Sequence, residues 1–216
     1  MNRHSRTIRA LAAALSALAG FVDAIGFIST GGFFVSFMSG NTTRLGVGLA
    51  AGSREAAIAA ALIALFVAGV VLGSLVGRRT KHRRVAVLLL LALLLSIAAA
   101  FGSAQLTLPS LVAVALAMGA ENTVFERDHE LPVGLTYMTG TLVKAGQRIA
   151  SALSGGERWA WLPFLWHWFA LAAGAALGAL AYPRIGLGGL WIAALLAGAL
   201  ALVALGLDRN PAATQP

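Results

Sequence analysis

Four ionisable residues lie where the surrounding sequence is apolar or only weakly polar: Asp23, Arg44, Glu121 and Lys144. A charged side chain near the centre of a bilayer costs roughly 2.5–3.5 kcal/mol on insertion scales, so such residues are usually paired or face a water-filled cavity. Two interpretations stay open. The four residues form structural ion pairs, Asp23 with Arg44 and Glu121 with Lys144 or the crossed pairs, or they line a pathway for a substrate or an ion.

The two cations belong to two similar segments, FMSGNTTRLG at residues 37–46 and YMTGTLVKAG at residues 137–146. Each segment has an aromatic residue, Met, a small hydroxyl residue and Gly in the same order. Because glycine breaks regular helices readily, we expect a break in the helix at each of these glycines. The polar and glycine residues assigned to the two broken-helix loops are Ser39, Gly40, Asn41, Thr42, Asn122, Thr139, Gly140 and Thr141.

The expected helix starts are compatible with either an anion or a cation as the bound species. Asn41 or Thr42, and Thr141, are expected to cap helices over about residues 42–52 and 141–153. A helix N-terminus favours an anion, and a cation in its first turn is unfavourable unless negative charge is nearby. That charge is either a substrate anion or the two carboxylates. Alternatively, the carboxylates and the loop carbonyls bind Na⁺ or a proton, as the unwound helices of some transporters do.

The composition is that of an integral membrane protein. The chain has 216 residues, of which 59% are hydrophobic and 11% are charged, and its mean hydropathy is +0.84. The net charge of +8 comes mainly from cations beside apolar runs, which indicates the positive-inside bias of membrane proteins and no nucleic-acid partner. We expect an all-α polytopic fold with the lipid bilayer around it.

Six long apolar helices and two broken segments account for most of the chain. The predicted helices span about residues 9–29, 56–77, 85–103, 108–125, 163–182 and 187–207, and the broken segments span about 31–52 and 132–153.

The two halves of the chain repeat. Residues 20–23 align with 119–122, residues 37–50 with 137–150, and residues 68–75 with 173–180. Ordered similarity of this kind indicates one membrane domain, residues 1–216, composed of a first repeat at about 8–104 and a second at about 106–207.

Basic residues predict the topology. Cations cluster at residues 3–9 and again at 78–84, and both clusters face the cytoplasm if the broken segments are re-entrant and do not cross. Six crossings then place both termini in the cytoplasm. Three crossings per repeat make the second repeat inverted relative to the first, as in many transporters.

The sequence GFVDAIGFISTGGFFVSFMSGNTTRLG at residues 20–46, together with AMGAENT and YMTGTLVK in the second half, resembles the YoaK-like family. These are bacterial integral membrane proteins classed as a domain of unknown function. Glu121 stands where that family more typically has Gln, and Ser39 where Thr is usual. The resemblance implies a multi-pass protein of the bacterial inner membrane and names no substrate.

These observations predict a small transporter or channel-like protein that moves a small solute or ion past the two broken-helix loops. The alternative is a non-transporting membrane scaffold or sensor with structural ion pairs. We expect no enzyme, because no His–acid pair accompanies Ser39 or Thr139 and the chain has no cysteine. No metal and no cofactor are expected. The patterns Gly69-x3-Gly73-x3-Gly77 and Gly174-x3-Gly178 indicate helix packing faces, either within the fold or between the protomers of a homo-oligomer.

Overall fold

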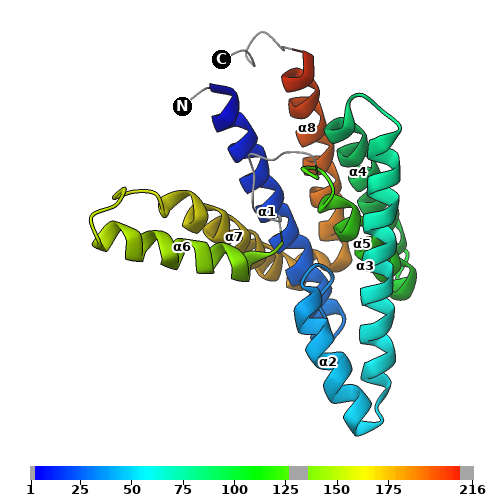
Figure 1. The fold of residues 1–216 in the computed structure, drawn as a ribbon. Helices are drawn as coiled ribbons and strands as arrows, with labels where there is room; N and C mark the ends of the chain where they lie inside the picture. Colours follow the sequence, from blue (N-terminus) through cyan, green and yellow to red (C-terminus); the bar gives the residue numbers. More distant parts are fainter. Residues whose placement is uncertain (1–2, 127–135, 210–216) are drawn as a thin grey trace.

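The computed structural model describes residues 3–126 and 136–209, and within these residues the chain is helical (Figure 1). The elements are α1 (Arg3–Ser29), α2 (Met38–Ala51), α3 (Arg54–Arg78), α4 (Arg83–Ser103), α5 (Thr107–Glu121), α6 (Met138–Leu153), α7 (Leu162–Ile185), the 3₁₀-helix η1 (Gly186–Gly189) and α8 (Leu190–Arg209). The predicted all-α class is confirmed. The predicted long helices correspond to α1, α3, α4, α5, α7 and α8.

Four helical stretches among the described residues are long and apolar enough to cross a membrane. They are Thr7–Ser29, Arg54–Arg78, Arg83–Ser103 and the 47-residue stretch Leu162–Asp208, which contains α7, η1 and α8. Helix α5 is apolar but has only 15 residues, because it ends at Glu121 and not at residue 125 as predicted. At about 1.5 Å per residue it is shorter than the hydrocarbon core.

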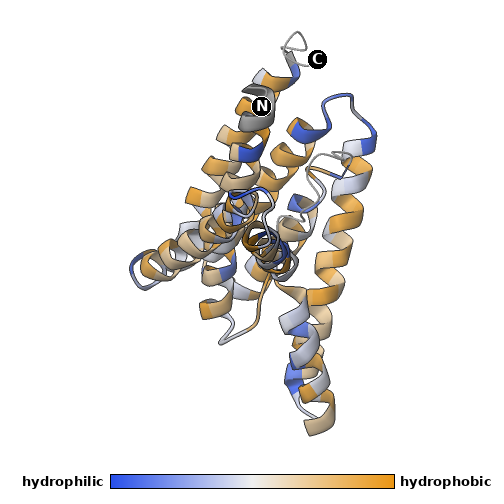
Figure 2. Cartoon of the chain, turned by 60° about the vertical axis from the view of Figure 1, so that its left-hand side comes forward, coloured by the Kyte–Doolittle hydropathy of each residue, from blue (hydrophilic) through white to orange (hydrophobic). Residues whose placement is uncertain are grey.

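Hydrophobic residues predominate along the helices (Figure 2), and many of them are exposed on the outside of the bundle. On α8, for example, Leu195 is 74% exposed and Leu202 is 71% exposed. A surface of this kind suits lipid and not water. The hydrophilic residues gather instead at turns, most visibly at the turn between α3 and α4.

Glycines bring two pairs of helices into backbone contact. A Cβ atom added at Gly174 of α7 would overlap the carbonyl oxygen of Ala17 in α1. In the same way, a Cβ atom added at Gly69 of α3 would overlap the carbonyl oxygen of Leu116 in α5. The predicted repeat aligns Gly174 with Gly69, and the offset that aligns residues 20–23 with 119–122 also relates Ala17 to Leu116, so the two contacts lie at matching positions of the two halves. Helix α7 of the second half therefore packs against α1 of the first half, and α3 of the first half packs against α5 of the second half.

The directions of the helices follow from these contacts. Gly178 lies against Phe21, one turn beyond the contact of Gly174 with Ala17, so α1 and α7 run parallel. The end of α8 lies beside the turn between α3 and α4, where Asp208 Oδ2 is 3.1 Å from His82 Nδ1. Helices α4 and α8, which correspond to each other in the repeat, therefore run in opposite directions (Figure 1).

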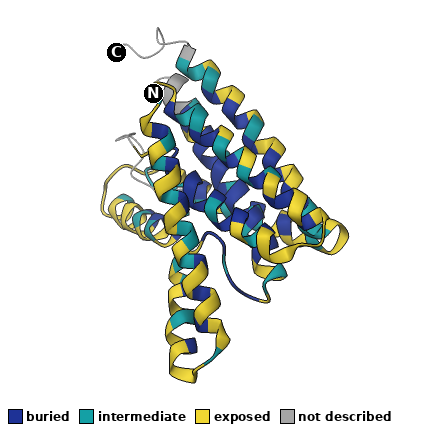
Figure 3. Cartoon of the chain, turned by 90° about the vertical axis from the view of Figure 1, so that its right-hand side faces the viewer, coloured by how far each residue is buried: buried dark blue, intermediate teal, exposed yellow. Residues whose placement is uncertain are grey.

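The core lies between α1, α4, α5 and α8 (Figure 3). Its fully buried large side chains include Leu15, Leu18, Leu88, Leu91 and Met118. Alanines fill most of the remaining positions and allow the helices to approach closely. Helices α2 and α6 lie outside this core, each packed against the helix that follows it, α3 and α7 respectively.

Candidate functional site

Asp23 anchors the loop that follows α1, residues 30–37. Its Oδ1 atom accepts hydrogen bonds from the backbone N–H groups of Val35 and Ser36, both at 2.8 Å. The predicted ion pair of Asp23 with Arg44 is therefore wrong, because backbone amides of this irregular segment take the place of the cation. Arg44 instead lies over the ring of Phe33, with its Cζ atom 4.8 Å from the ring centroid, in a cation–π arrangement.

The chain breaks earlier than the sequence predicts. Gly31 and Gly32 have positive φ angles of 70° and 117°, a conformation that glycine adopts without steric cost. Helix α2 then begins at Met38, and no side chain caps it. The predicted start at about residue 42 is wrong, and Gly40 lies within the first turn of the helix.

Gly40 and Gly140 have a packing role in these first turns. A Cβ atom at Gly40 would lie 2.8 Å from ring carbons of Phe34 and Phe37. A Cβ atom at Gly140 would overlap the ring of Tyr137. The shared aromatic-Met-Ser/Thr-Gly pattern thus describes a ring folded over a glycine at the start of α2 and again at the start of α6.

Asn41 holds the loop and does not cap the helix. Its side chain is fully buried. Its Nδ2 atom donates to the carbonyl oxygen of Phe34 at 2.6 Å, and the N–H of Phe34 donates to its Oδ1 atom at 3.0 Å. Thr42 donates back to the carbonyl oxygen of Met38 at 2.9 Å, while the side chain of Ser39 is exposed. Most polar groups of this loop are therefore used to fix its shape.

The second half repeats part of this arrangement. Asn122, the counterpart of Asp23, accepts a hydrogen bond from the hydroxyl of Thr136 at 3.0 Å, and Thr136 is the counterpart of Ser36 in the repeat. Thr139 is exposed, and the buried Thr141 donates to the carbonyl oxygen of Tyr137 at 3.3 Å. Thr141 is therefore not a cap, since α6 begins at Met138. The predicted break in this half includes residues 132–135, which lie outside the described residues.

Glu121 is the exception among these polar groups. It is fully buried at the last position of α5, and within the described part of the chain neither of its carboxyl oxygens has a hydrogen-bond partner. Lys144 lies half-buried on α6 and makes no hydrogen bond to Glu121, so the predicted pair of these two residues is not formed. A buried carboxyl group without a partner is costly, and it calls for a functional explanation.

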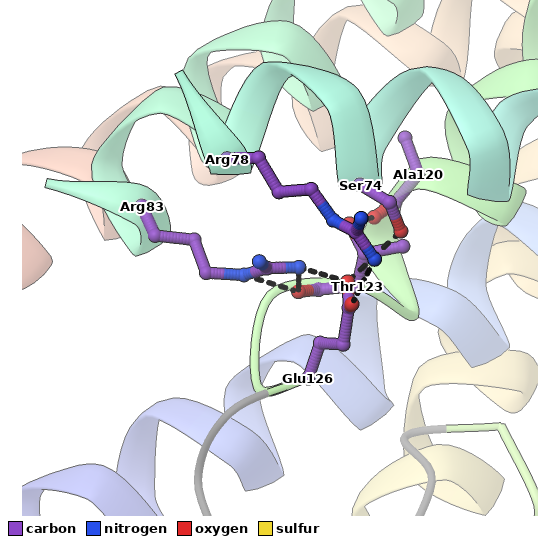
Figure 4. A network of polar contacts seen from close by, with 6 residues as sticks. All are labelled: Ser74, Arg78, Arg83, Ala120, Thr123 and Glu126. Atoms are coloured by element: carbon purple, nitrogen blue, oxygen red, sulfur yellow. Dashed lines mark hydrogen bonds and ion pairs between the residues drawn. The ribbon is translucent and has the colours of Figure 1, made fainter. Parts of the chain in front are cut away.

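An acidic residue that the sequence analysis missed lies close beyond α5. Glu126 accepts a hydrogen bond from the hydroxyl of Ser74 at 2.9 Å and contacts the guanidinium of Arg83 (Figure 4). Arg83 also donates to the carbonyl oxygen of Thr123 at 3.2 Å, and Arg78 Nη2 lies 3.8 Å from Glu126 Oε1.

Opposing effects act on the pKa of Glu126. Burial raises the pKa, but the hydrogen bonds from Ser74 and Arg83 and the charges of Arg83 and Arg78 lower it, and the net pKa lies below its ordinary value.

The stretch FERDHE, residues 125–130, is predicted from the sequence to be a solvated connection between helices. Glu126 is exposed, as that interpretation expects, and it is also held by Ser74 and Arg83; residues 127–130 lie outside the described residues. Two features of the sequence could have indicated this network: an acidic residue just after the end of a predicted helix, and a dense cluster of arginines at residues 78–84.

Comparison with known proteins places the chain among membrane proteins of similar sequence. Residues 11–203 match the family described as "Protein of unknown function (DUF1275)". The chain belongs to the DUF1275 family. It is also 38% identical over 209 residues to a UPF0700 transmembrane protein of Rhizobium meliloti (strain 1021), an alignment that covers 96% of this chain and 91% of that relative. No solved structure matches significantly.

Membership of DUF1275 confirms the expected resemblance to uncharacterised membrane proteins. The matched residues include both loops and the helices that pack against them, from α1 to most of α8. The family description assigns no activity, so the function of this DUF1275 protein has to be argued from its buried polar groups.

Proposed function

We propose that this DUF1275 protein is a small membrane transporter or channel-like protein that moves a small ion or solute past its two broken-helix loops. The observation that carries the proposal is Glu121, a fully buried carboxyl group without a hydrogen-bond partner in the part of the chain that the structure describes. Ionisable groups at membrane depth commonly take part in ion pathways and proton relays.

Glu121 favours a proton or a small cation over an anion as the transported or coupled species. A carboxylate offers only acceptor sites, and a neutral carboxyl group has a proton to release. Of the other groups considered, Arg44, a cation that could bind an anion, lies over Phe33, and Asp23 already binds two backbone amides. Among the four ionisable residues singled out from the sequence, Glu121 is the one whose buried side chain has no hydrogen-bond partner in the described part of the chain.

The architecture proposed for this activity is two inverted repeats with re-entrant broken segments. The equivalent glycine contacts of Gly174 and Gly69 support it, as do the opposite directions of α4 and α8. In this arrangement the two loops enter from opposite faces of the bacterial inner membrane and both termini are cytoplasmic.

A second candidate function is a non-transporting scaffold or sensor. The hydrogen bonds of Asp23 and Asn41 favour it, because they fix the first loop in one conformation and leave those polar side chains no free role. Under this alternative Glu121 is a tolerated buried acid. Loss of Glu121 would then affect stability only.

Flux measurements in proteoliposomes separate the two candidates. The full-length protein is reconstituted, and uptake of protons and of Na⁺ is followed with ion-sensitive dyes. We expect flux of one of these ions, and at least a tenfold lower flux for Glu121→Gln, which keeps the shape of the side chain.

The matched control is Glu157→Gln, which removes an exposed carboxylate between α6 and α7 and should leave the flux unchanged. Absence of flux of either ion in the unmodified protein would count against the proposal. An unchanged flux for a folded Glu121→Gln variant would remove Glu121 from the pathway and favour the scaffold.

A further inference from the structure

A basic pocket lies at the end of the bundle where α3 turns into α4 and α8 ends. It has a volume of about 550 Å³, and its lining residues are Arg78, Arg79, Thr80, Lys81, Arg83, Arg84, Val124 and Asp208. This volume lies within the roughly 300–1,000 Å³ of typical small-molecule sites. Five of the eight lining residues are cations and one is an acid, so the pocket suits an anionic ligand.

The acids among the described residues neutralise only part of this charge. Asp208 lies near His82 and Arg84, at 3.1 and 3.8 Å, and Glu126 lies between Arg83 and Arg78. Arg79 and Lys81 are exposed and make no ion pair with a described residue. These two side chains are free to turn toward a ligand at the mouth of the pocket.

Arg83 distinguishes this pocket from an exposed charged loop, because its guanidinium is buried and fixed in position. Its side chain is 10% exposed, and its Nη1 atom has no hydrogen-bond partner within the described part of the chain. Its Nε and Nη2 atoms are held by the carbonyl oxygen of Thr123, and the side chain packs against Gly77. A buried guanidinium with an unused donor is the group that commonly binds phosphate.

Lipid-facing helices lead up to the pocket. On α3, Val71 is 54% exposed and Leu75 is 49% exposed, within about two turns of Arg78. On α4, Leu89 is 54% exposed and Leu93 is 58% exposed. An acyl chain lying along these residues would bring its headgroup to the ends of both helices.

We propose that the pocket binds the phosphate-bearing headgroup of an anionic phospholipid. The cations of the α3–α4 turn would bind the phosphate, with Arg79 and Lys81 closing over it, while the acyl chains lie along α3 and α4. General positive-inside bias explains exposed cations near a membrane, but it does not explain a buried arginine with an unused donor inside a pocket. Basic pockets between membrane helices bind anionic headgroups in this way.

The test measures the thermal stability of the full-length protein in neutral detergent micelles. Phosphatidylglycerol, phosphatidylcholine or inorganic phosphate is added to the unmodified protein, and the shift of the unfolding midpoint is recorded. The same measurements are made on the double variant Arg79→Gln/Lys81→Gln. Neither residue contributes to the core, so the variant is expected to fold.

We expect phosphatidylglycerol to raise the midpoint more than phosphatidylcholine does, and the double variant to lose at least half of that difference. The matched control, Arg54→Gln/Arg184→Gln, removes two exposed cations outside the pocket and should keep the full difference. Equal shifts with the two lipids, or a full phosphatidylglycerol effect in the pocket variant, would overturn the proposal. A full effect of inorganic phosphate alone would assign the pocket to a free anion and also overturn the lipid assignment.

Discussion

The Oδ1 atom of Asp23 lies 2.8 Å from the backbone nitrogen of Ser36, and in the second half the Oδ1 atom of Asn122 lies 3.0 Å from the hydroxyl oxygen of Thr136. Both halves thus attach a loop to the preceding helix at matching positions, the first with a carboxyl group that accepts from backbone amides and the second with an amide that accepts from a hydroxyl group. We therefore expect Asp23 to hold the loop, since the second half has a neutral side chain at the matching position.

The first prediction concerns this attachment. Asp23→Ala should destabilise the protein by about 2–3 kcal/mol, because it leaves two buried backbone amides without their hydrogen-bond acceptor. Asp23→Asn should cost about 1 kcal/mol, because its amide oxygen still accepts. Hydrogen exchange measures the effect locally, and the amides of Val35 and Ser36 should exchange faster in the alanine variant.

Ser39→Ala is the control for this measurement, since the side chain of Ser39 is exposed and the substitution should leave exchange of residues 33–37 unchanged. Unaltered exchange in Asp23→Ala would show that the loop does not depend on Asp23.

The second prediction concerns the equivalent glycine contacts. Gly174→Ala and Gly69→Ala should each destabilise the protein by about 1–3 kcal/mol, because the added methyl group overlaps a backbone carbonyl of the neighbouring helix. Gly198→Ala is the matched control within α8, where an added Cβ atom meets nothing within 4 Å, and it should be neutral or stabilising. Unfolding in mixed detergent micelles provides the measurement. A Gly174→Ala variant as stable as Gly198→Ala would contradict the close packing of α1 and α7.

These contacts also explain why much of the fold could be predicted from sequence. Long apolar runs predict membrane helices directly. The predicted ends of α3, α4 and α8 lie within a few residues of the ends in the structure. The small-residue spacing of Gly69 and Gly174 marked helix packing faces correctly. Which helices meet was not predictable, because the partner surfaces on α1 and α5 are ordinary alanine and leucine positions.

The site was less predictable, for physical reasons. A sequence shows which side chains are charged, but it does not show which backbone N–H groups lack a partner. A cation was therefore the expected partner of Asp23. In the structure its carboxyl group accepts hydrogen bonds from two backbone amides of an irregular loop. The sequence predicts the break at Gly40, whereas the residues with positive φ between α1 and α2 are Gly31 and Gly32. That Glu121 is buried without a partner depends on how α5 packs, and no local pattern encodes it.

The third prediction distinguishes Glu121 from Asp23. Because Glu121 has no hydrogen-bond partner among the described residues, Glu121→Met should be neutral or stabilise the protein by about 1–3 kcal/mol, as replacement of unsatisfied buried polar groups does. The measurement is the free energy of unfolding beside that of Asp23→Ala, which should change in the opposite direction. A loss of more than about 2 kcal/mol in Glu121→Met would mean that the carboxyl group has a stabilising partner.

The fourth prediction is the pH dependence of the contacts of Glu126. The pKa of Glu126 in the folded protein lies below its ordinary value of 4.5, so its contribution to stability is present above that value and is lost as pH falls through the lower folded pKa. Glu126→Gln should therefore be less stable than the unmodified protein at pH 7, by about 1 kcal/mol or less because the exposed side chain is screened by solvent. The difference should shrink as the pH falls below the ordinary pKa value of 4.5.

Unfolding midpoints of both proteins between pH 7 and pH 3 give the comparison. Glu157→Gln, with its exposed side chain, serves as the control and should show little difference at any pH. A stability difference for Glu126→Gln that persists unchanged at the lowest pH would show that its charge is not what stabilises the network in Figure 4.

The last prediction tests the proposed membrane topology, which the absence of native cysteine makes accessible to labelling. Cysteine introduced at Thr80, beside the α3–α4 turn, should react with an impermeant maleimide only from the cytoplasmic side. Cysteines at Ser39 and Thr139, which are both exposed at the starts of α2 and α6, should react from opposite sides, because inverted repeats place the two loops on opposite faces. Labelling of Thr80→Cys from outside the cell would exclude the re-entrant arrangement, since it requires a broken segment to cross. Labelling of the Ser39 and Thr139 cysteines from the same side would instead exclude inversion of the two repeats.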